Sequence, residues 1–341
     1  MNRRTLLGAL ACLPSATARA DRTARALRRG ADYLWSRQSA GGGWHSTTYG
    51  LLRSGHSLTP LVLLALADTR DRRIGRGLAF LERAAQADGA LGLSEDDYPC
   101  YATALGLRAI VRLAARDHPL VQRMVAWLKS QQMSPDHGWR PEDPAFGAWG
   151  LGSARPLTAP HCGHIDLSMT RYVLEALAEA GVPAGDSAMA NSLVFVRRCR
   201  NADGSFFFST VETGANKAGE AGDGFAGYGS ATADGILALL AAGDSAVADS
   251  VGWLRDHDDP ELPQGFPSAA RLRYAQGLRY YYADCATRAF RAAGVARTVP
   301  FADTLLTAQR RDGSWANTEP LVKEDDPLIA TAFALSALKS L

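Results

Sequence analysis

The chain has 341 residues, of which 47% are hydrophobic and 21% charged, and its formal net charge is +2. A near-neutral chain with scattered charges lacks the basic patch of a nucleic-acid or anionic-membrane binder, so we expect neither partner. Beyond the first residues no segment approaches roughly eighteen unbroken apolar residues, so we expect no transmembrane helix.

The first twenty residues have the features of a secretory signal. Arg3 and Arg4 precede a short apolar run over Leu6–Leu13, and Ala18–Ala20 has the small-residue pattern of a cleavage site. The paired arginines favour a twin-arginine signal. We therefore predict a cleavable segment at 1–20, a single domain at 21–341 and a periplasmic or secreted location. Loss of the three arginines in 1–20 would change the formal net charge from +2 to −1.

A helical pattern recurs through the rest of the chain. Within Asp166–Leu177, Thr170 is followed six and seven residues later by Ala176 and Leu177. A motif whose copies recur along the chain at intervals of tens of residues indicates a repeat architecture. The same spacing begins at Thr59, Thr103, Thr232 and Thr331, and Ala283 replaces the threonine in a sixth copy.

A second motif alternates with the first. It is a helix that ends in a glycine turn followed by an aromatic residue, and its clearest copy runs from Gln309 to Trp315. Looser copies end at Trp44, Trp139 and Phe206. Glycine supplies the left-handed conformation that ends a helix, and the aromatic side chain can pack back and seal the turn.

The two kinds of helix differ in polarity. The helices led by threonine are apolar on several faces, which is typical of helices buried on both sides, whereas the others carry charges on one face. We therefore predict an all-α fold, an (α/α)6 toroid of six helical-hairpin repeats. Long insertions at 141–164, 210–228 and 260–279 all precede inner helices, so we expect irregular loops that gather at one mouth of the ring.

The cysteines outside the predicted signal leave two interpretations open. Export permits disulfides. Cys100 and Cys162 both lie just before an inner helix, so they are our preferred pair, and the alternative is four buried thiols. These cysteines are Cys100, Cys162, Cys199 and Cys285.

The glutamine–tryptophan turn and the threonine-led helices together resemble the prenyltransferase and squalene–hopene cyclase repeat family over roughly residues 28–341. This resemblance implies an α-α toroid. It also implies a place for a catalytic acid, because the cyclases protonate an alkene with an Asp-x-Asp-Asp-Thr motif at the start of an inner helix. Here Asp166 and Thr170 are kept, whereas Ser168 and Met169 replace the later acids. A serine cannot supply that proton, so the resemblance leaves catalysis doubtful.

Two further motifs of the family transfer poorly. A literal Asp-x-Asp-Asp occurs at Asp256–Asp259, but it ends an outer helix before Pro260 and is typical of a charged turn. The protein prenyltransferases hold zinc with an Asp and a Cys one residue apart. Here Asp284 and Cys285 are adjacent, so their side chains point about 100° apart on a helix.

Residues at the start of the inner helices should ring the mouth of the cavity. The candidate catalytic residues are Asp166, His164, Asp97 and Asp284. The candidate ligand-binding residues are His56, Tyr228, Tyr281, Tyr282 and Asp326. Several of the acids, Asp97, Asp166 and Asp326 among them, have a structural alternative as a helix cap, and the tyrosines have one in core packing.

A metal site has weak support. His161, Cys162 and His164 could supply zinc ligands, with Cys100 or Asp166 completing the set. A single cluster without a second spaced pair is a poor signal, so we expect no metal and no cofactor.

Three functions are compatible with the predicted toroid and its candidate site residues. The first is an exported toroid that binds an isoprenoid or other hydrophobic small molecule in its cavity. The second is a glycan-active lyase or hydrolase that pairs carboxylates such as Asp97, Asp166 and Asp326. The third is a non-catalytic protein-interaction module. Apolar and aromatic walls would favour the first, paired acids in an open cleft the second, and a filled lumen the third.

Overall fold

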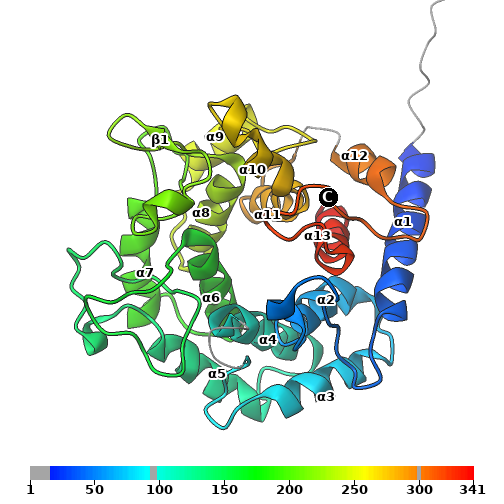
Figure 1. Ribbon diagram of the computed structural model, residues 1–341, viewed down its shortest axis with the longest axis horizontal. Helices are drawn as coiled ribbons and strands as arrows, with labels where there is room; N and C mark the ends of the chain where they lie inside the picture. The colour runs from blue at the N-terminus through cyan, green and yellow to red at the C-terminus, as the bar shows by residue number, and fades with distance from the viewer. Residues whose placement is uncertain (1–15, 93–97, 298–300) are drawn as a thin grey trace, which may run out of the picture.

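The computed structural model describes residues 16–92, 98–297 and 301–341, and in these residues twelve of the thirteen α-helices form two concentric rings (Figure 1). Each helix of the inner ring packs against the next, and the last packs against the first, so the inner ring is closed. The inner helices are α2 (Leu58–Leu66), α4 (Pro99–Leu113), α6 (Leu167–Glu179), α8 (Gly229–Ala241), α11 (Arg279–Ala292) and α13 (Pro327–Ser340).

The outer ring packs on the inner one and alternates with it along the chain (Figure 1). The all-α toroid that the sequence predicts is therefore confirmed. The outer helices are α1 (Ala16–Ser36), α3 (Ile74–Ala84), α5 (Pro119–Ser130), α7 (Ser187–Arg198), α9 (Ala248–Asp256) and α12 (Phe301–Ala308).

The connections hold short elements. Two of the three long insertions are less irregular than we expect from their composition, because one contains an antiparallel pair of two-residue strands and another contains helix α10. These elements are η1 (Gly50–Leu52), η2 (Ala67–Thr69), η4 (Pro135–His137), η5 (Thr213–Ala215), β1 (Glu220–Ala221), β2 (Gly224–Phe225), η6 (Ala269–Arg271) and α10 (Leu272–Gly277).

The repeated threonine fastens each glycine turn to its inner helix. The backbone N–H of Trp44 donates to the Thr59 hydroxyl at 3.0 Å, and that of Trp315 donates to Thr331 at 3.0 Å. The indole N–H of Trp315 also donates to the carbonyl of Leu305 on the outer helix at 2.8 Å. A buried N–H needs a partner, so the threonine recurs because its hydroxyl supplies one. The equivalent pairs are Leu91–Thr103, Trp149–Thr170 and Phe206–Thr232.

In the third repeat the predicted turn at Trp139 is wrong. Trp149, two residues after Gly147, occupies the sealing position, and its backbone N–H donates to Thr170 at 3.2 Å. The indole N–H of Trp139 instead donates to the carbonyl of Leu157 within the insertion. Two tryptophans follow a glycine closely in this segment, and the later one, Trp149, lies within hydrogen-bond distance of Thr170 on the inner helix.

In three repeats a glutamine joins the turn to the start or body of the next outer helix. The Gln309 side-chain amide donates to the carbonyls of Gly313 and of Ala26 on α1, both at 2.9 Å. Gly313 has a φ of +91°, and a Cβ there would lie 2.4 Å from the carbonyl oxygen of Arg29. Only glycine permits this approach. This joint unites the last repeat with the first helix, so it closes the ring.

The predicted disulfide between Cys100 and Cys162 is wrong. All four cysteines of the described residues are free thiols, and Cys100, Cys199 and Cys285 are buried. Burial raises the pKa of the Cys100 thiol well above its usual range, which keeps it protonated and unreactive. The alternative of buried thiols holds for these three, whereas Cys162 is half-buried.

The predicted signal segment lies mostly outside the described residues, because 1–15 are among those not described. Helix α1 begins at Ala16, a few residues before the expected cleavage point. Among the described helices none is both long and apolar enough to cross a membrane.

Candidate functional site

A cavity of about 260 Å³ lies inside the inner ring, at the end where the inner helices begin. Its walls are mostly apolar or aromatic. Leu151, Lys217 and Leu278 reach it from the three long insertions, so the expectation that these loops meet at one mouth is confirmed. The side chains that the inner helices contribute are Leu58, Leu61, Tyr101, Ser168, Met169, Tyr172, Tyr281, Ile329 and Phe333.

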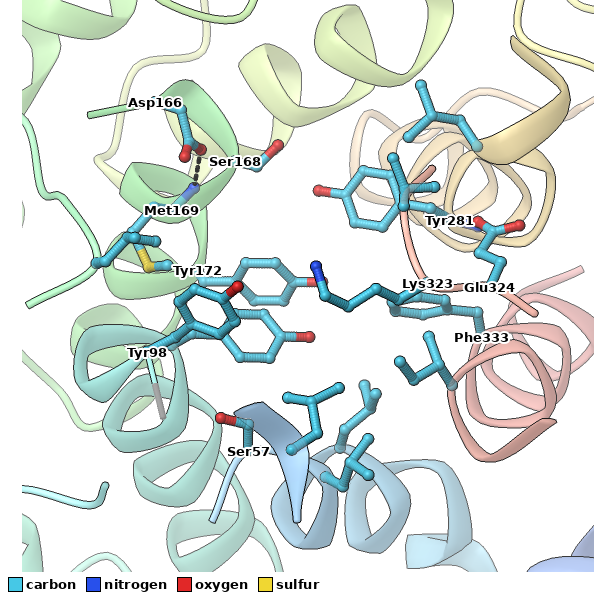
Figure 2. A pocket seen from close by; sticks show the side chains of 18 of the residues that line it. Ser57, Tyr98, Asp166, Ser168, Met169, Tyr172, Tyr281, Lys323, Glu324 and Phe333 are labelled. Atoms are coloured by element: carbon cyan, nitrogen blue, oxygen red, sulfur yellow. Dashed lines mark hydrogen bonds between the residues drawn. The ribbon is translucent and has the colours of Figure 1, made fainter. Parts of the chain in front are cut away.

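Four ionisable side chains other than tyrosine line this cavity, namely Asp166, Lys217, Lys323 and Glu324. Figure 2 shows Asp166 on the α6 side of the cavity and Glu324 on the opposite side, beside Phe333 of α13. Of these four, only Asp166 is a residue that the sequence predicts at the site; Lys217, Lys323 and Glu324 carry no such signal.

Asp166 combines both roles that the sequence left open. One carboxylate oxygen accepts the backbone N–H of Met169 at 2.7 Å, which caps α6 (Figure 2). The other lies 3.1 Å from Nε2 of His164, and Asp166 also lines the cavity. The hydrogen bond to Asp166 raises the pKa of His164 above 6.5, although burial opposes it. The His164 imidazole is therefore held against the Asp166 carboxylate, which itself lines the cavity.

Glu324 is a buried carboxyl that caps α11 from a neighbouring loop. It accepts the backbone N–H groups of Tyr280 at 2.9 Å and of Tyr281 at 2.7 Å, and an amide N–H of Asn317 at 3.1 Å. Burial raises its pKa to about 8, and these three donors oppose that shift only in part. At neutral pH Glu324 is therefore mostly uncharged.

A buried ionic network lies next to the cavity. The guanidinium of Arg171, which is fully buried, donates to Asp234 at 3.0 Å, to Glu175 at 2.8 Å and to the hydroxyl of Tyr281 at 2.8 Å. It also lies 3.6 Å from the centre of the Tyr172 ring. Charged groups buried together in this way fix the positions of the aromatic side chains around them.

The network extends away from the mouth. Glu175 also accepts from Arg108 at 2.9 Å and from Arg288. Arg108 and Arg288 line a second cavity, of about 60 Å³, together with Asp284. Leu61, Tyr172 and Phe333 line both cavities and so form the boundary between them.

The place of the cyclase acid is occupied by a serine that contacts a covered carboxyl. Ser168 lines the cavity and donates to Asp234 of α8 at 2.6 Å. Asp234 does not line the cavity, and its oxygens also accept from Arg171 and Tyr281. Burial raises the pKa of Asp234, and Arg171 opposes that shift. The carboxyl nearest this place is therefore engaged by protein donors and not presented to a ligand.

His56 and Tyr228, which we expected at the mouth, do not line the cavity. The His56 ring lies 6.1 Å from that of Phe80, on the outer helix α3. Tyr228 is buried 5.1 Å from the ring of Phe266. Both residues precede an inner helix, but their rings lie near Phe80 and Phe266, which do not line the cavity.

Tyr282 points to the outside of the inner ring. Its hydroxyl donates to Asp258 at 2.8 Å, and Asp258 also accepts from Nε of Arg297 at 2.7 Å. The guanidinium of Arg297 lies 3.8 Å from the ring centre of Phe301 on α12. The Asp256–Asp259 motif is thus more than a charged turn, because one of its acids forms a buried ion pair.

The remaining candidates have structural positions or lie outside the described residues. Asp326 caps α13 by accepting the N–H of Leu328 at 2.9 Å, as the capping alternative predicts, and it does not line the mouth cavity. Asp284 faces the smaller cavity and pairs with Arg288 at 3.6 Å. Asp97 is not among the described residues.

The structure shows no metal centre in the part of the chain that it describes, since no three His, Cys, Asp or Glu side chains there could hold an ion. His161, Cys162 and His164, the weak zinc candidates, form no such group. His164 is instead bonded to Asp166.

Solved structures share this fold at low sequence identity. A variant of the type II terpene cyclase MstE from Scytonema in complex with geranylgeranyl dihydroxybenzoate matches with a TM-score of 0.60 and 14% identity, covering 95% of this chain and 99% of that one. A ligand-free variant matches with a TM-score of 0.62 and 13% identity, covering 95% and 98%. A protein from Actinoplanes matches with a TM-score of 0.56 and 17% identity, covering 93% and 99%.

These matches show that the chain is an α-α toroid with the terpenoid cyclase fold. A scan with protein-family models finds no match, and a search of curated proteins finds none either. At such identities the likeness is one of fold, and function must be argued from the site.

Proposed function

We propose that this toroid binds a hydrophobic small molecule of isoprenoid type in its central cavity. The observation that carries the proposal is the cavity wall, which is lined by Leu58, Leu61, Tyr172, Ile329 and Phe333. Ligand pockets of about 300–1,000 Å³ with mostly apolar walls and a few polar groups are typical of small-molecule sites. At about 260 Å³, this cavity lies just below that range, so it suits a single ligand at the small end.

The terpenoid cyclase fold supports the same class of ligand. MstE, whose fold this chain shares, has been solved with geranylgeranyl dihydroxybenzoate as substrate and with merosterolic acid A as product. Alkene protonation is not part of our proposal, because Ser168 holds the place of the acid and Asp234 behind it is covered.

The glycan alternative has less support. Asp166 and Glu324 line one cavity, but their oxygens are engaged by protein groups: by helix-start N–H donors in both and also by His164 in Asp166. The walls around them are apolar, whereas a glycosidase needs an acid and a base free on either side of a sugar.

Ligand titration of the purified protein tests the proposal. Farnesol should quench the intrinsic fluorescence in a saturable way, and mass spectrometry of the protein as isolated should recover an apolar ligand. Ile329→Trp places a larger ring in the cavity and should abolish binding. Ile74→Trp, on the outer helix α3, is the matched control and should bind normally. Binding of a glucan but not of farnesol, or equal binding by both variants, would refute the proposal.

We also propose export through the twin-arginine route, on the basis of Arg3 and Arg4. Replacing both by lysine should retain the protein in the cytoplasm, as cell fractionation would show. A wild-type protein found in the cytoplasmic fraction would refute this location.

A further inference from the structure

Two lysines line the cavity without an anionic partner among the described residues. Neither Lys217 nor Lys323 forms an ion pair or a side-chain hydrogen bond with any residue that the structure describes, and each instead lies near aromatic rings. Both side chains are half-buried, and an ammonium held against apolar walls without a counter-ion is unfavourable, so such groups are normally paired or bind something.

Lys217 shows this most clearly. Its Nζ lies 3.4 Å from the centre of the Phe208 ring, a cation–π contact that attracts the charge without neutralising it. Burial lowers the pKa of Lys217 to about 8, and Asp166 and Asp234 oppose that shift only in part. The amine is therefore still protonated in most molecules at neutral pH.

Lys323 reaches the same cavity from the loop before α13 (Figure 2). Its Nζ lies 5.9 Å from the ring centre of Tyr98, another cavity residue. Both residues have left-handed backbones, with φ of +67° at Lys323 and +49° at Tyr98. Strain of this kind in non-glycine residues is concentrated at ligand sites, where the surrounding structure holds it in place.

The acids of the cavity do not satisfy these lysines. Asp166 is bonded to Met169 and His164, and Glu324 accepts three N–H donors and is mostly uncharged at neutral pH. The cavity lining therefore carries an excess of positive charge inside apolar walls. An apolar molecule alone would leave both ammonium groups unpaired, whereas an amphipathic anion would pair with them.

We propose that Lys217 and Lys323 bind the anionic head group, a carboxylate or a phosphate, of an amphipathic ligand whose apolar chain fills the cavity. This inference rests on the proposed function and specifies the chemistry of its ligand. It assigns the lysines a binding role at the mouth, beside Phe208 and Tyr98.

Three ligands with one chain test the assignment, namely farnesol, farnesoic acid and farnesyl phosphate. The wild-type protein should bind the anion of the correct type about tenfold or more tightly than the alcohol, because a hydrogen bond to a charged group contributes about 1.5–3 kcal/mol. Preference for the acid identifies a carboxylate head group, and preference for the phosphate identifies a phosphate. In Lys217→Met and Lys323→Met the anion should bind about tenfold more weakly, with the affinity for farnesol unchanged.

Two controls separate binding from folding. Lys129→Met removes a lysine that pairs with Asp186 at 2.7 Å on the outer ring, and it should leave all three affinities unchanged. Lys217→Arg keeps the charge and should retain the preference for the anion. Because an unpaired, half-buried charge beside apolar walls is removed, Lys217→Met should melt at or above the wild-type temperature. A lower melting temperature would instead make Lys217 a structural residue and overturn its assignment.

The outcomes distinguish this inference from the proposed function. If farnesol binds as tightly as both anions, or if the methionine variants keep the preference, the head-group assignment is wrong and the cavity proposal stands. If none of the three ligands binds, the cavity proposal is wrong and the head-group assignment falls with it.

Discussion

Replacing Arg171 by methionine should destabilise the fold by about 3–5 kcal/mol, the usual loss when one member of a buried ion pair is removed. The side chain donates to Asp234, Glu175 and Tyr281, and it is fully buried. Glu175 keeps Arg108 as a partner at 2.9 Å. Among the described residues no other cation is bonded to Asp234, so most of the loss should come from its poorly compensated charge.

Urea unfolding followed by circular dichroism measures this loss, because the midpoint falls with stability at constant slope. Arg197→Met is the matched control. Arg197 pairs with Asp244 at 2.6 Å at the surface, so its removal should change stability by less than about 1 kcal/mol. Adding Asp234→Asn to Arg171→Met should recover part of the loss. The reasoning would be refuted if Arg171→Met and Arg197→Met proved equally mild, or if the second substitution recovered nothing.

Three further predictions concern the joints and the rim. Gly313→Ala, whose Cβ would meet the Arg29 carbonyl at 2.4 Å, should lower the unfolding midpoint markedly, whereas Gly252→Ala, with open space around it, should not. The pKa of Glu324 is about 8 in the folded protein and about 4.5 in the unfolded chain, so between these pH values the folded state binds more protons and its stability should fall as the pH rises. Glu324→Gln should reduce this pH dependence of the unfolding free energy, as measured by urea titration. Asp166→Asn keeps a capping side chain but removes a negative charge from the cavity. The melting temperature should therefore stay unchanged while an anionic ligand binds more tightly. A loss of stability of about 1 kcal/mol with unaltered ligand binding would show that Asp166 is only a helix cap.

The ring could be predicted from the sequence because its joints depend on local chemistry. A threonine hydroxyl that receives a turn N–H, and a glycine that permits a close approach, each leave one required residue type in every repeat. The third repeat could not be assigned in this way, since Gly138 directly precedes Trp139 and Gly147 lies two residues before Trp149. Only the three-dimensional distance to Thr170 decides between them.

The candidate site was less accessible to sequence reasoning. Asp166 was found through the matching motif, but Lys217, Lys323 and Glu324 lie in loops, where no period indicates which side chain faces inward. The buried charge of Asp234 did have a signal, namely a lone acid in an otherwise apolar helix. Its partners come from α6 and α11, and their convergence depends on how the ring closes.

The glutamine contacts have a consequence for how the ring is assembled. Gln38 and Gln132 reach carbonyls 35 and 56 residues further along the chain, so these contacts can form while synthesis proceeds. Gln309 reaches back 283 residues, to Ala26. Contacts of such long range are slow to form because the intervening chain must first be ordered. Until Gln309 makes this contact, the ring is open and the cavity is not fully enclosed. Ligand binding should therefore appear only at the final step of folding.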